Sequence, residues 1–112
     1  MKITVICRVE PGCLGPHGAD HVEDFCHFAQ KEFDLVDPTK VDWQIEPRFD
    51  KTLSEIQYKL KNRNLSSKQA GLYLDALGKE QDAFEETLFK QLAESVSHYM
   101  AKGQALNRKI AG

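Results

Sequence analysis

Apolar and polar positions alternate in three short stretches of the chain, which are residues 2–9, 41–46 and 56–61. A period of two residues is typical of β-strands, because successive side chains point to opposite faces of a sheet. In the first stretch both faces are largely apolar, whereas the second and third are apolar on one face only. We expect the second and third strands to pair as a hairpin, with acidic residues of one opposite lysines of the other. The residues concerned are Asp42, Glu46, Lys59 and Lys61.

The third stretch has an alternative interpretation. Thr52 and Glu55 have the spacing of a capping box, so residues 52–62 also fit the start of a helix. The alternation of Ile56 and Tyr58 with polar residues favours the strand. The choice between strand and helix rests on this periodicity.

Apolar residues recur every three or four positions in three other stretches, which is typical of amphipathic helices. After a loop at residues 10–19, rich in glycine and proline, we expect the first helix to begin at Asp20. Asp20 and Glu23 have capping-box spacing, and Asp37 before a proline marks the end of this segment.

The second predicted helix begins with another capping box, formed by Ser66 and Gln69, and ends at Gly78. The third covers residues 79–102. It has acidic residues at its start and Lys102 at its end, and both placements complement the helix dipole.

The order strand, helix, strand, strand, helix, helix predicts an α+β fold, in which a small antiparallel or mixed three-stranded sheet is packed on one face by three helices. The length of 112 residues fits one domain. We expect Gly103 to end the last helix, so that residues 1–103 form the domain and residues 104–112 a flexible C-terminal tail.

The composition is that of an ordinary globular protein, with 41% hydrophobic and 29% charged residues and a formal net charge of −2. So small a net charge gives no bulk electrostatic attraction to nucleic acid or to an anionic membrane. No apolar run approaches the roughly 20 residues that cross a bilayer, and none has the length of a secretory signal. Together with an odd number of cysteines, this predicts a cytoplasmic protein with reduced thiols.

Residues 7–27 hold all three cysteines and three of the four histidines. Cys7 is in phase with the apolar positions of the first strand and Cys26 lies on the apolar face of the first helix, so both are expected in the core. The glycine-rich loop holds a candidate zinc site, which is formed by Cys13, His17 and His21 with the spacing C-x3-H-x3-H. The close cysteine pairs of structural zinc sites are absent from the sequence, so zinc is an alternative and we expect no cofactor.

The same loop offers a thiol-dependent chemistry. Cys13 precedes a predicted helix, whose dipole would lower the pKa of a thiol at its start. The second cysteine of a C-x-x-C motif is missing from the sequence. Redox chemistry is therefore the weaker use of this loop.

A basic stretch runs through the third strand, with no acidic residue between Glu55 and Asp75. We take Lys59, Lys61 and Arg63 as a candidate binding surface, because alternation would place them on one strand face. No aromatic residue is interleaved on that face to stack with bases, so the sequence argues against nucleic acid as a partner.

The last predicted helix carries Phe89 and Ala93 beside its main apolar stripe, so its apolar arc is wide. We expect this flank to contact another protein, first of all a second copy of the chain, since symmetric dimers are the commonest assemblies. No segment shows a catalytic motif, which favours binding over catalysis. The sequence thus predicts a non-catalytic interaction domain that forms a homodimer without a membrane partner, with a zinc-binding or thiol-dependent protein as the alternative.

Overall fold

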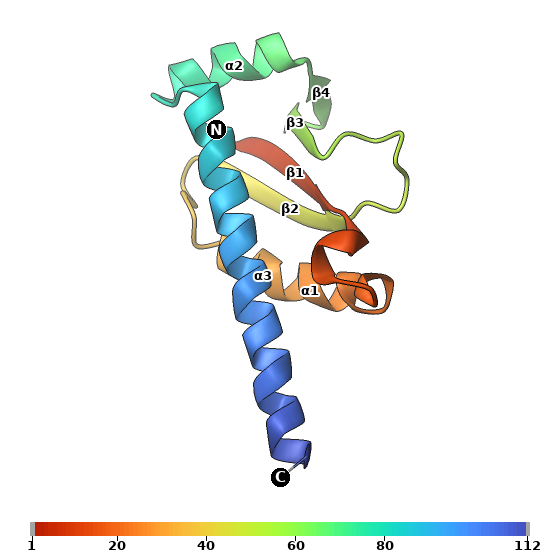
Figure 1. The fold of residues 1–112 in the computed structure, drawn as a ribbon. Helices are drawn as coiled ribbons and strands as arrows, with labels where there is room; N and C mark the ends of the chain where they lie inside the picture. The colour runs from red at the N-terminus through yellow and green to blue at the C-terminus, as the bar shows by residue number, and fades with distance from the viewer. Residues whose placement is uncertain (1, 112) are drawn as a thin grey trace.

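The computed structural model describes the backbone of residues 2–111 and the side chains of residues 2–102. In this part of the chain, a four-stranded mixed sheet packs with three α-helices (Figure 1). The elements in chain order are β1 (Ile3–Val9), a 3-10 helix η1 (Pro11–Leu14), α1 (Gly18–Phe33), β2 (Val41–Pro47), β3 (Ile56–Leu60), β4 (Arg63–Leu65), α2 (Ser67–Ala76) and α3 (Gln81–Ala111). The α+β class is confirmed, whereas the predicted three-stranded sheet is wrong, because a short fourth strand follows β3.

β1 is a central strand of the sheet. The strand order is β2-β1-β3-β4, with β1 parallel to β2 and antiparallel to β3. β1 is buried on both faces, since even Ile6, on the face away from the core cluster, is only 3% exposed. A strand that is apolar on both faces gains most at the centre of a sheet, so the half-polar β2 and β3 flank it. The predicted hairpin of the second strand with the third is therefore wrong.

The predicted ion pairs across that hairpin are also wrong, because β1 separates the two strands. Asp42 instead pairs with Lys2, at 3.5 Å between Oδ1 and Nζ. Glu46 lies opposite Arg8 in the register of β1 with β2, and its Oε1 accepts a hydrogen bond from Arg8 Nε at 3.0 Å. The acidic residues of β2 are thus neutralised by bases on or beside β1.

β3 and β4 form a hairpin whose turn consists of Lys61 and Asn62. Their φ angles are 50° and 65°, which is the left-handed conformation of a type I′ turn. Because lysine rarely occupies such a position, the sequence gives only a weak turn signal here, and the fourth strand is not predicted from it. Ahead of β3, Thr52 donates hydrogen bonds from its N–H (3.0 Å) and Oγ1 (2.6 Å) to Asp50 Oδ1, so it forms a turn and starts no helix. The strand interpretation of residues 56–60 is confirmed.

α1 begins earlier than predicted, at Gly18, and His17 precedes it without a side-chain cap. A Cβ at Gly18 would lie 1.7 Å from the carbonyl oxygen of Pro11, so η1 packs directly on the backbone of the first helical turn. This contact requires glycine at the first helical position. Asp20 lies within the first turn, so the predicted capping box at Asp20 is wrong. α1 ends at Phe33, ahead of the predicted limit.

Both ends of α2 match their sequence signals. The capping box is confirmed: Gln69 N–H donates to Ser66 Oγ at 3.1 Å, and Ser66 N–H donates to Gln69 Oε1 at 2.9 Å. At the other end, Gly78 has a φ of 78°, and its N–H donates to the Asp75 carbonyl at 2.9 Å. Such a left-handed glycine stops a helix and satisfies its last carbonyl groups.

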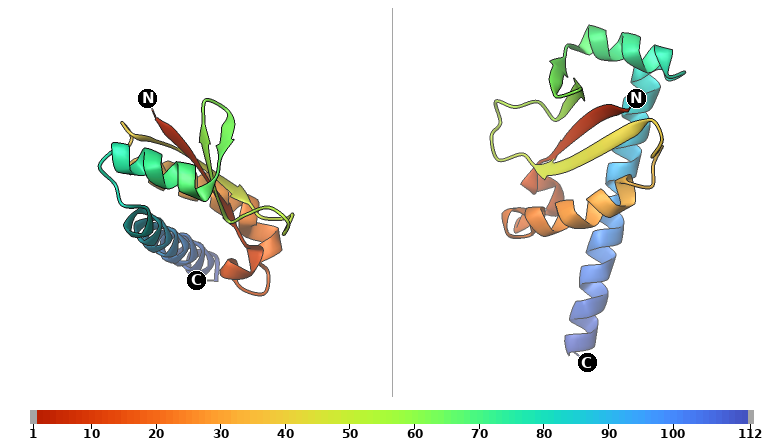
Figure 2. Two further views of the ribbon diagram at one scale, coloured as in Figure 1. Left: turned by 90° about the horizontal axis from the view of Figure 1, so that it is seen from above. Right: turned by 180° about the vertical axis from the view of Figure 1, so that it is seen from behind.

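α3 continues through Gly103 to Ala111, so the predicted helix end at Gly103 is wrong. One glycine costs a helix only about 1 kcal/mol relative to alanine, and the following Gln-Ala-Leu sequence favours helix. The helix crosses α1 and extends beyond it (Figure 2). The predicted flexible tail at residues 104–112 lies outside the residues with described side chains and stays a prediction. None of the helices in residues 2–111 combines the length and hydrophobicity needed to span a membrane.

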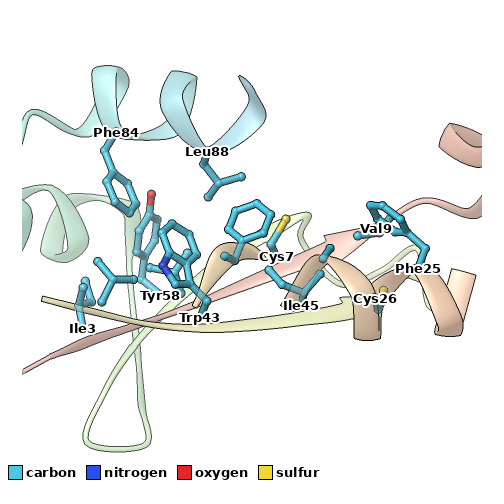
Figure 3. Close-up of a cluster of buried hydrophobic side chains, with 14 of the residues drawn as sticks. Ile3, Cys7, Val9, Phe25, Cys26, Trp43, Ile45, Tyr58, Phe84 and Leu88 are labelled. Atoms are coloured by element: carbon cyan, nitrogen blue, oxygen red, sulfur yellow. The ribbon is translucent and has the colours of Figure 1, made fainter. Parts of the chain in front are cut away.

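One hydrophobic core joins the sheet to the helices, and its buried side chains come from one face of β1–β3 and from α1, α2 and α3 (Figure 3). Aromatic rings fill its centre: Trp43 lies 5.0 Å from Phe33 and 5.7 Å from Phe84 between ring centroids. Cys7 and Cys26 belong to this core, with 1% and 5% of their surface exposed, so the assignment of both to packing is confirmed.

Candidate functional site

The buried cysteines are chemically inert at neutral pH. The pKa of the Cys7 thiol is raised to about 12, mainly by burial and to a smaller extent by the neighbouring Cys26. Burial likewise raises the pKa of Cys26 to about 12, with a smaller contribution from Glu46. Since the thiolate is the reactive form of cysteine, neither thiol is an activated nucleophile at neutral pH.

The candidate zinc ligands lie in three different local settings. Cys13 is exposed in η1, His17 directly precedes α1, and His21 is exposed in the first turns of α1. Among the residues that the structure describes, no three histidine, cysteine, aspartate or glutamate side chains lie where they could hold one metal ion. The structure therefore assembles no ligand set for zinc there. Cys13 also stands apart from the N-terminus of α1, which begins at Gly18.

The candidate basic surface is divided by the β3–β4 turn. Lys59 lies opposite Asn64, and Leu60 lies opposite Arg63. Because side chains alternate between faces, Lys59 and Arg63 point to opposite sides of the sheet, and Lys61 lies in the turn. The expectation that three bases share one strand face is thus wrong. In the described part of the chain, no carboxylate lies within ion-pair distance of any of the three.

The two predicted interface residues come together on a flank of α3. Phe89 and Ala93 line a shallow groove whose other walls are charged: Asp82, Glu85, Glu86 and Lys90. Phe89 remains 45% exposed, and Met100, at helical spacing along the same flank, is 41% exposed. Val96, between them, is partly buried. The groove therefore has a mainly acidic border, and an apolar strip continues from it along this flank to Met100.

The charges of α3 are divided along its length. Residues 81–94 hold four acidic residues and one lysine. Residues 95–111 hold Lys102, Arg108 and Lys109 and no acidic residue. The two halves of the helix therefore carry opposite charge, and the apolar strip spans the boundary between them.

α1 holds α3 on a different side from this strip. Tyr99 OH donates to Asp24 Oδ2 at 3.0 Å, and His98 Nδ1 lies 3.0 Å from Glu32 Oε2. The ring of Tyr99 packs edge-on against Phe25, with centroids 5.5 Å apart. These contacts fix the direction of the helix while leaving its strip uncovered in this single chain.

A buried arginine, Arg8, is the clearest feature that the sequence reasoning missed. It is only 8% exposed, and its guanidinium donates to Glu46, to the Ser54 carbonyl (2.8 Å) and to Gln57 Oε1 (2.7 Å). Arg48 similarly donates to the Leu53 carbonyl at 2.9 Å, so the loop before β3 is fixed by two guanidinium groups. A charged residue within an otherwise largely apolar strand is the sequence signal for such a network.

Of the predicted surfaces, the flank of α3 is the one where exposed apolar side chains, a groove and a charge pattern coincide. The loop that holds Cys13 shows no assembled ligands in the described residues, and the basic residues are divided between faces. The chain matches no protein-family model, and no curated protein and no solved structure is significantly similar to it.

Proposed function

We propose that this protein is a cytoplasmic, non-catalytic interaction domain that acts as a homodimer, with the Phe89 flank of α3 as its contact surface. The observation that carries the proposal is the strip of Phe89, Ala93 and Met100, exposed on a helix that extends beyond the rest of the fold. Large apolar side chains gathered on one surface of a small protein mark an interaction site more often than isolated ones do.

The charge pattern favours a second copy as the occupant of this surface. When two α3 helices pack antiparallel, the acidic half of each lies beside the basic half of the other. Parallel packing would place like charges together. An antiparallel pair is also self-complementary about a twofold axis, which is the usual symmetry of a homodimer.

The strip sets the register of this pairing. With the twofold axis beside residues 93–96, Phe89 of one chain lies against Met100 of the partner subunit. The small side chain of Ala93 allows the two helices to approach closely near the axis. Each exposed aromatic or thioether side chain is then covered by its counterpart.

The oligomeric state tests the proposal. We expect light scattering on a sizing column to give twice the chain mass of 12.7 kDa for the wild type at tens to hundreds of micromolar. Phe89→Glu should give the monomer mass with an unchanged circular dichroism spectrum, because a buried carboxylate is costly in a contact. The matched control is Leu35→Glu, at an 82% exposed position outside α3, which should remain a dimer. A monomeric wild type at the highest concentration contradicts the proposal.

Crosslinking tests the antiparallel arrangement separately. In a Cys13→Ser background, a short bis-maleimide should join two chains that carry Ala93→Cys. It should fail with Met100→Cys, because two copies of residue 100 would be offset by roughly 16 Å along the helix axis. Equal crosslinking at both positions would indicate parallel helices.

A further inference from the structure

A pocket of about 280 Å³ lies on the other side of α3 from the Phe89 flank. Gln91 lines this pocket whereas Phe89 lines the dimer groove, and residues two positions apart point to nearly opposite sides of a helix. The inner wall is aromatic: Trp43 and Phe84 are stacked at an interplanar angle of 10°, and Phe33 packs beside them. Figure 3 shows Phe84 reaching from α3 toward Trp43 on β2.

The rim of the pocket is charged and carries more acid than base. Asp37, from the α1–β2 connection, forms an ion pair with Lys79, from the α2–α3 connection. Lys79 Nζ lies 5.9 Å from the centroid of the Phe84 ring. The third charged residue is Glu80, whose carboxylate also accepts a hydrogen bond from Ala83 N–H at 3.0 Å. Two carboxylates and one ammonium group leave the mouth with a net negative charge.

We propose that this pocket binds a small aromatic amine, with its ring against Trp43 and Phe84 and its ammonium group beside Asp37 and Glu80. The volume suits such a molecule, because a cavity of about 150 Å³ already holds benzene and drug-sized ligands need about 300 Å³ or more. The negative rim favours a cation over an anion, and aromatic faces attract cations as well. This inference does not depend on dimer formation, since the two surfaces lie on opposite sides of α3.

The chain provides a specific reporter for the test. Trp43 is its single tryptophan, so its indole N–H gives one isolated signal in a ¹H–¹⁵N spectrum. We would titrate three molecules of similar shape: phenethylamine, ethylbenzene and phenylacetate. Phenethylamine should shift the indole signal saturably, with a dissociation constant in the roughly millimolar range expected for so few atoms. Phenylacetate should bind at least about tenfold more weakly, and ethylbenzene should lie between them.

Two variants locate the binding. Ala83→Leu adds bulk to an exposed helix position in the pocket wall and should abolish the phenethylamine shift without loss of folding. Asp37→Asn removes one rim charge, and asparagine tolerates the left-handed φ of 48° found there, so it should reduce the preference for the amine over ethylbenzene. The proposal is overturned if phenethylamine causes no saturable shift up to about ten times the expected dissociation constant, if phenylacetate binds equally well, or if Ala83→Leu leaves binding unchanged.

Discussion

The side chain of Gln30 closes the outer edge of β2, the terminal strand on that side of the sheet. From α1, its Nε2 donates to the Trp43 carbonyl at 2.8 Å, and its Oε1 accepts from the Ile45 N–H at 2.8 Å. One amide group thus supplies the donor and the acceptor that a neighbouring strand would supply. An edge whose backbone groups are satisfied in this way is a poor template for pairing with another chain.

Replacing Gln30 with glutamate keeps the shape and the acceptor but removes the donor. A carboxylate oxygen would then face the Trp43 carbonyl, and the hydrogen bond that Gln30 Nε2 donates to Asp34 Oδ1 at 2.8 Å would become a repulsion. Two lost hydrogen bonds at about 1 kcal/mol each, with roughly 1 kcal/mol of repulsion, lower the free energy of unfolding by about 3 kcal/mol at pH 7. Gln30→Ala loses all three hydrogen bonds without adding repulsion and should cost about 3 kcal/mol.

The two variants should differ most clearly in their pH dependence. A protonated glutamic acid can again donate to the Trp43 carbonyl, so folding favours the neutral form and raises the pKa of Glu at this position. The stabilisation from the protonated side chain is fully present below the pKa of about 4.3 that glutamate has in the unfolded chain. It is lost as the pH rises through the raised pKa of this group in the folded protein. Relative to the wild type, Gln30→Glu should therefore recover stability between pH 7 and pH 4, whereas Gln30→Ala should show a constant deficit.

Urea unfolding followed by Trp43 fluorescence at several pH values measures both deficits. Comparison with the wild type at each pH cancels the titration of groups that do not contact Gln30, and Gln30→Ala controls for the lost contact with Asp34. The reasoning would be refuted if Gln30→Glu were as stable as the wild type at pH 7, or if both variants kept the same deficit at every pH.

Three further predictions concern single positions. Gly18→Ala should lower the free energy of unfolding by at least about 3 kcal/mol, because its Cβ would meet the Pro11 carbonyl oxygen. The control Gly12→Ala has open space around the new Cβ and should change this free energy by no more than about 1 kcal/mol. Urea titrations measure both. A thiol reagent at pH 8 should modify one cysteine of the native chain, Cys13, and all three in urea; rapid modification of more than one would show that burial does not protect the other thiols. Asn62→Gly should raise the free energy of unfolding by up to about 1 kcal/mol, and with it the melting temperature, because glycine adopts the left-handed φ of 65° without strain. A lower melting temperature would contradict this.

Local patterns predicted the elements of this fold well, because their causes are local. The capping box of Ser66 and Gln69 and the stop at Gly78 involve residues within one turn of each other. The placement of Cys7 and Cys26 in the core follows from the period of a single strand and a single helix.

Errors arose where a contact distant in sequence decided the outcome. The sheet order depends on which strand is apolar on both faces. Ile6 marks β1 as that strand, but the strands that pair with β1 are distant from it in the sequence. α1 begins at Gly18, which lies directly against the backbone of Pro11, and no spacing of capping residues reveals this contact. α3 passes Gly103 because a glycine only weakens a helix whose neighbouring residues favour it.

The candidate surfaces show the same difference between local causes and contacts distant in sequence. Phe89 and Ala93 were predictable because both lie on one helix, and the period of that helix places them on one flank. The basic residues were not, since a turn at Lys61 reverses the chain between Lys59 and Arg63. The aromatic pocket was beyond sequence reasoning, because its walls come from two helices, a strand and two connections.

The protection of the sheet edges bears on how this chain can assemble. The β2 edge is closed by Gln30. The opposite edge, β4, has only three residues, of which Arg63 is one, and it follows Lys61 in the turn. Short length and basic residues are two of the means by which proteins prevent strand pairing between molecules. Edge-to-edge association is therefore disfavoured at both ends of the sheet, whereas the Phe89 flank has no comparable protection in the described residues. The dimer that we propose therefore uses side-chain packing on α3, where opposite charges on the two helix halves would select one orientation.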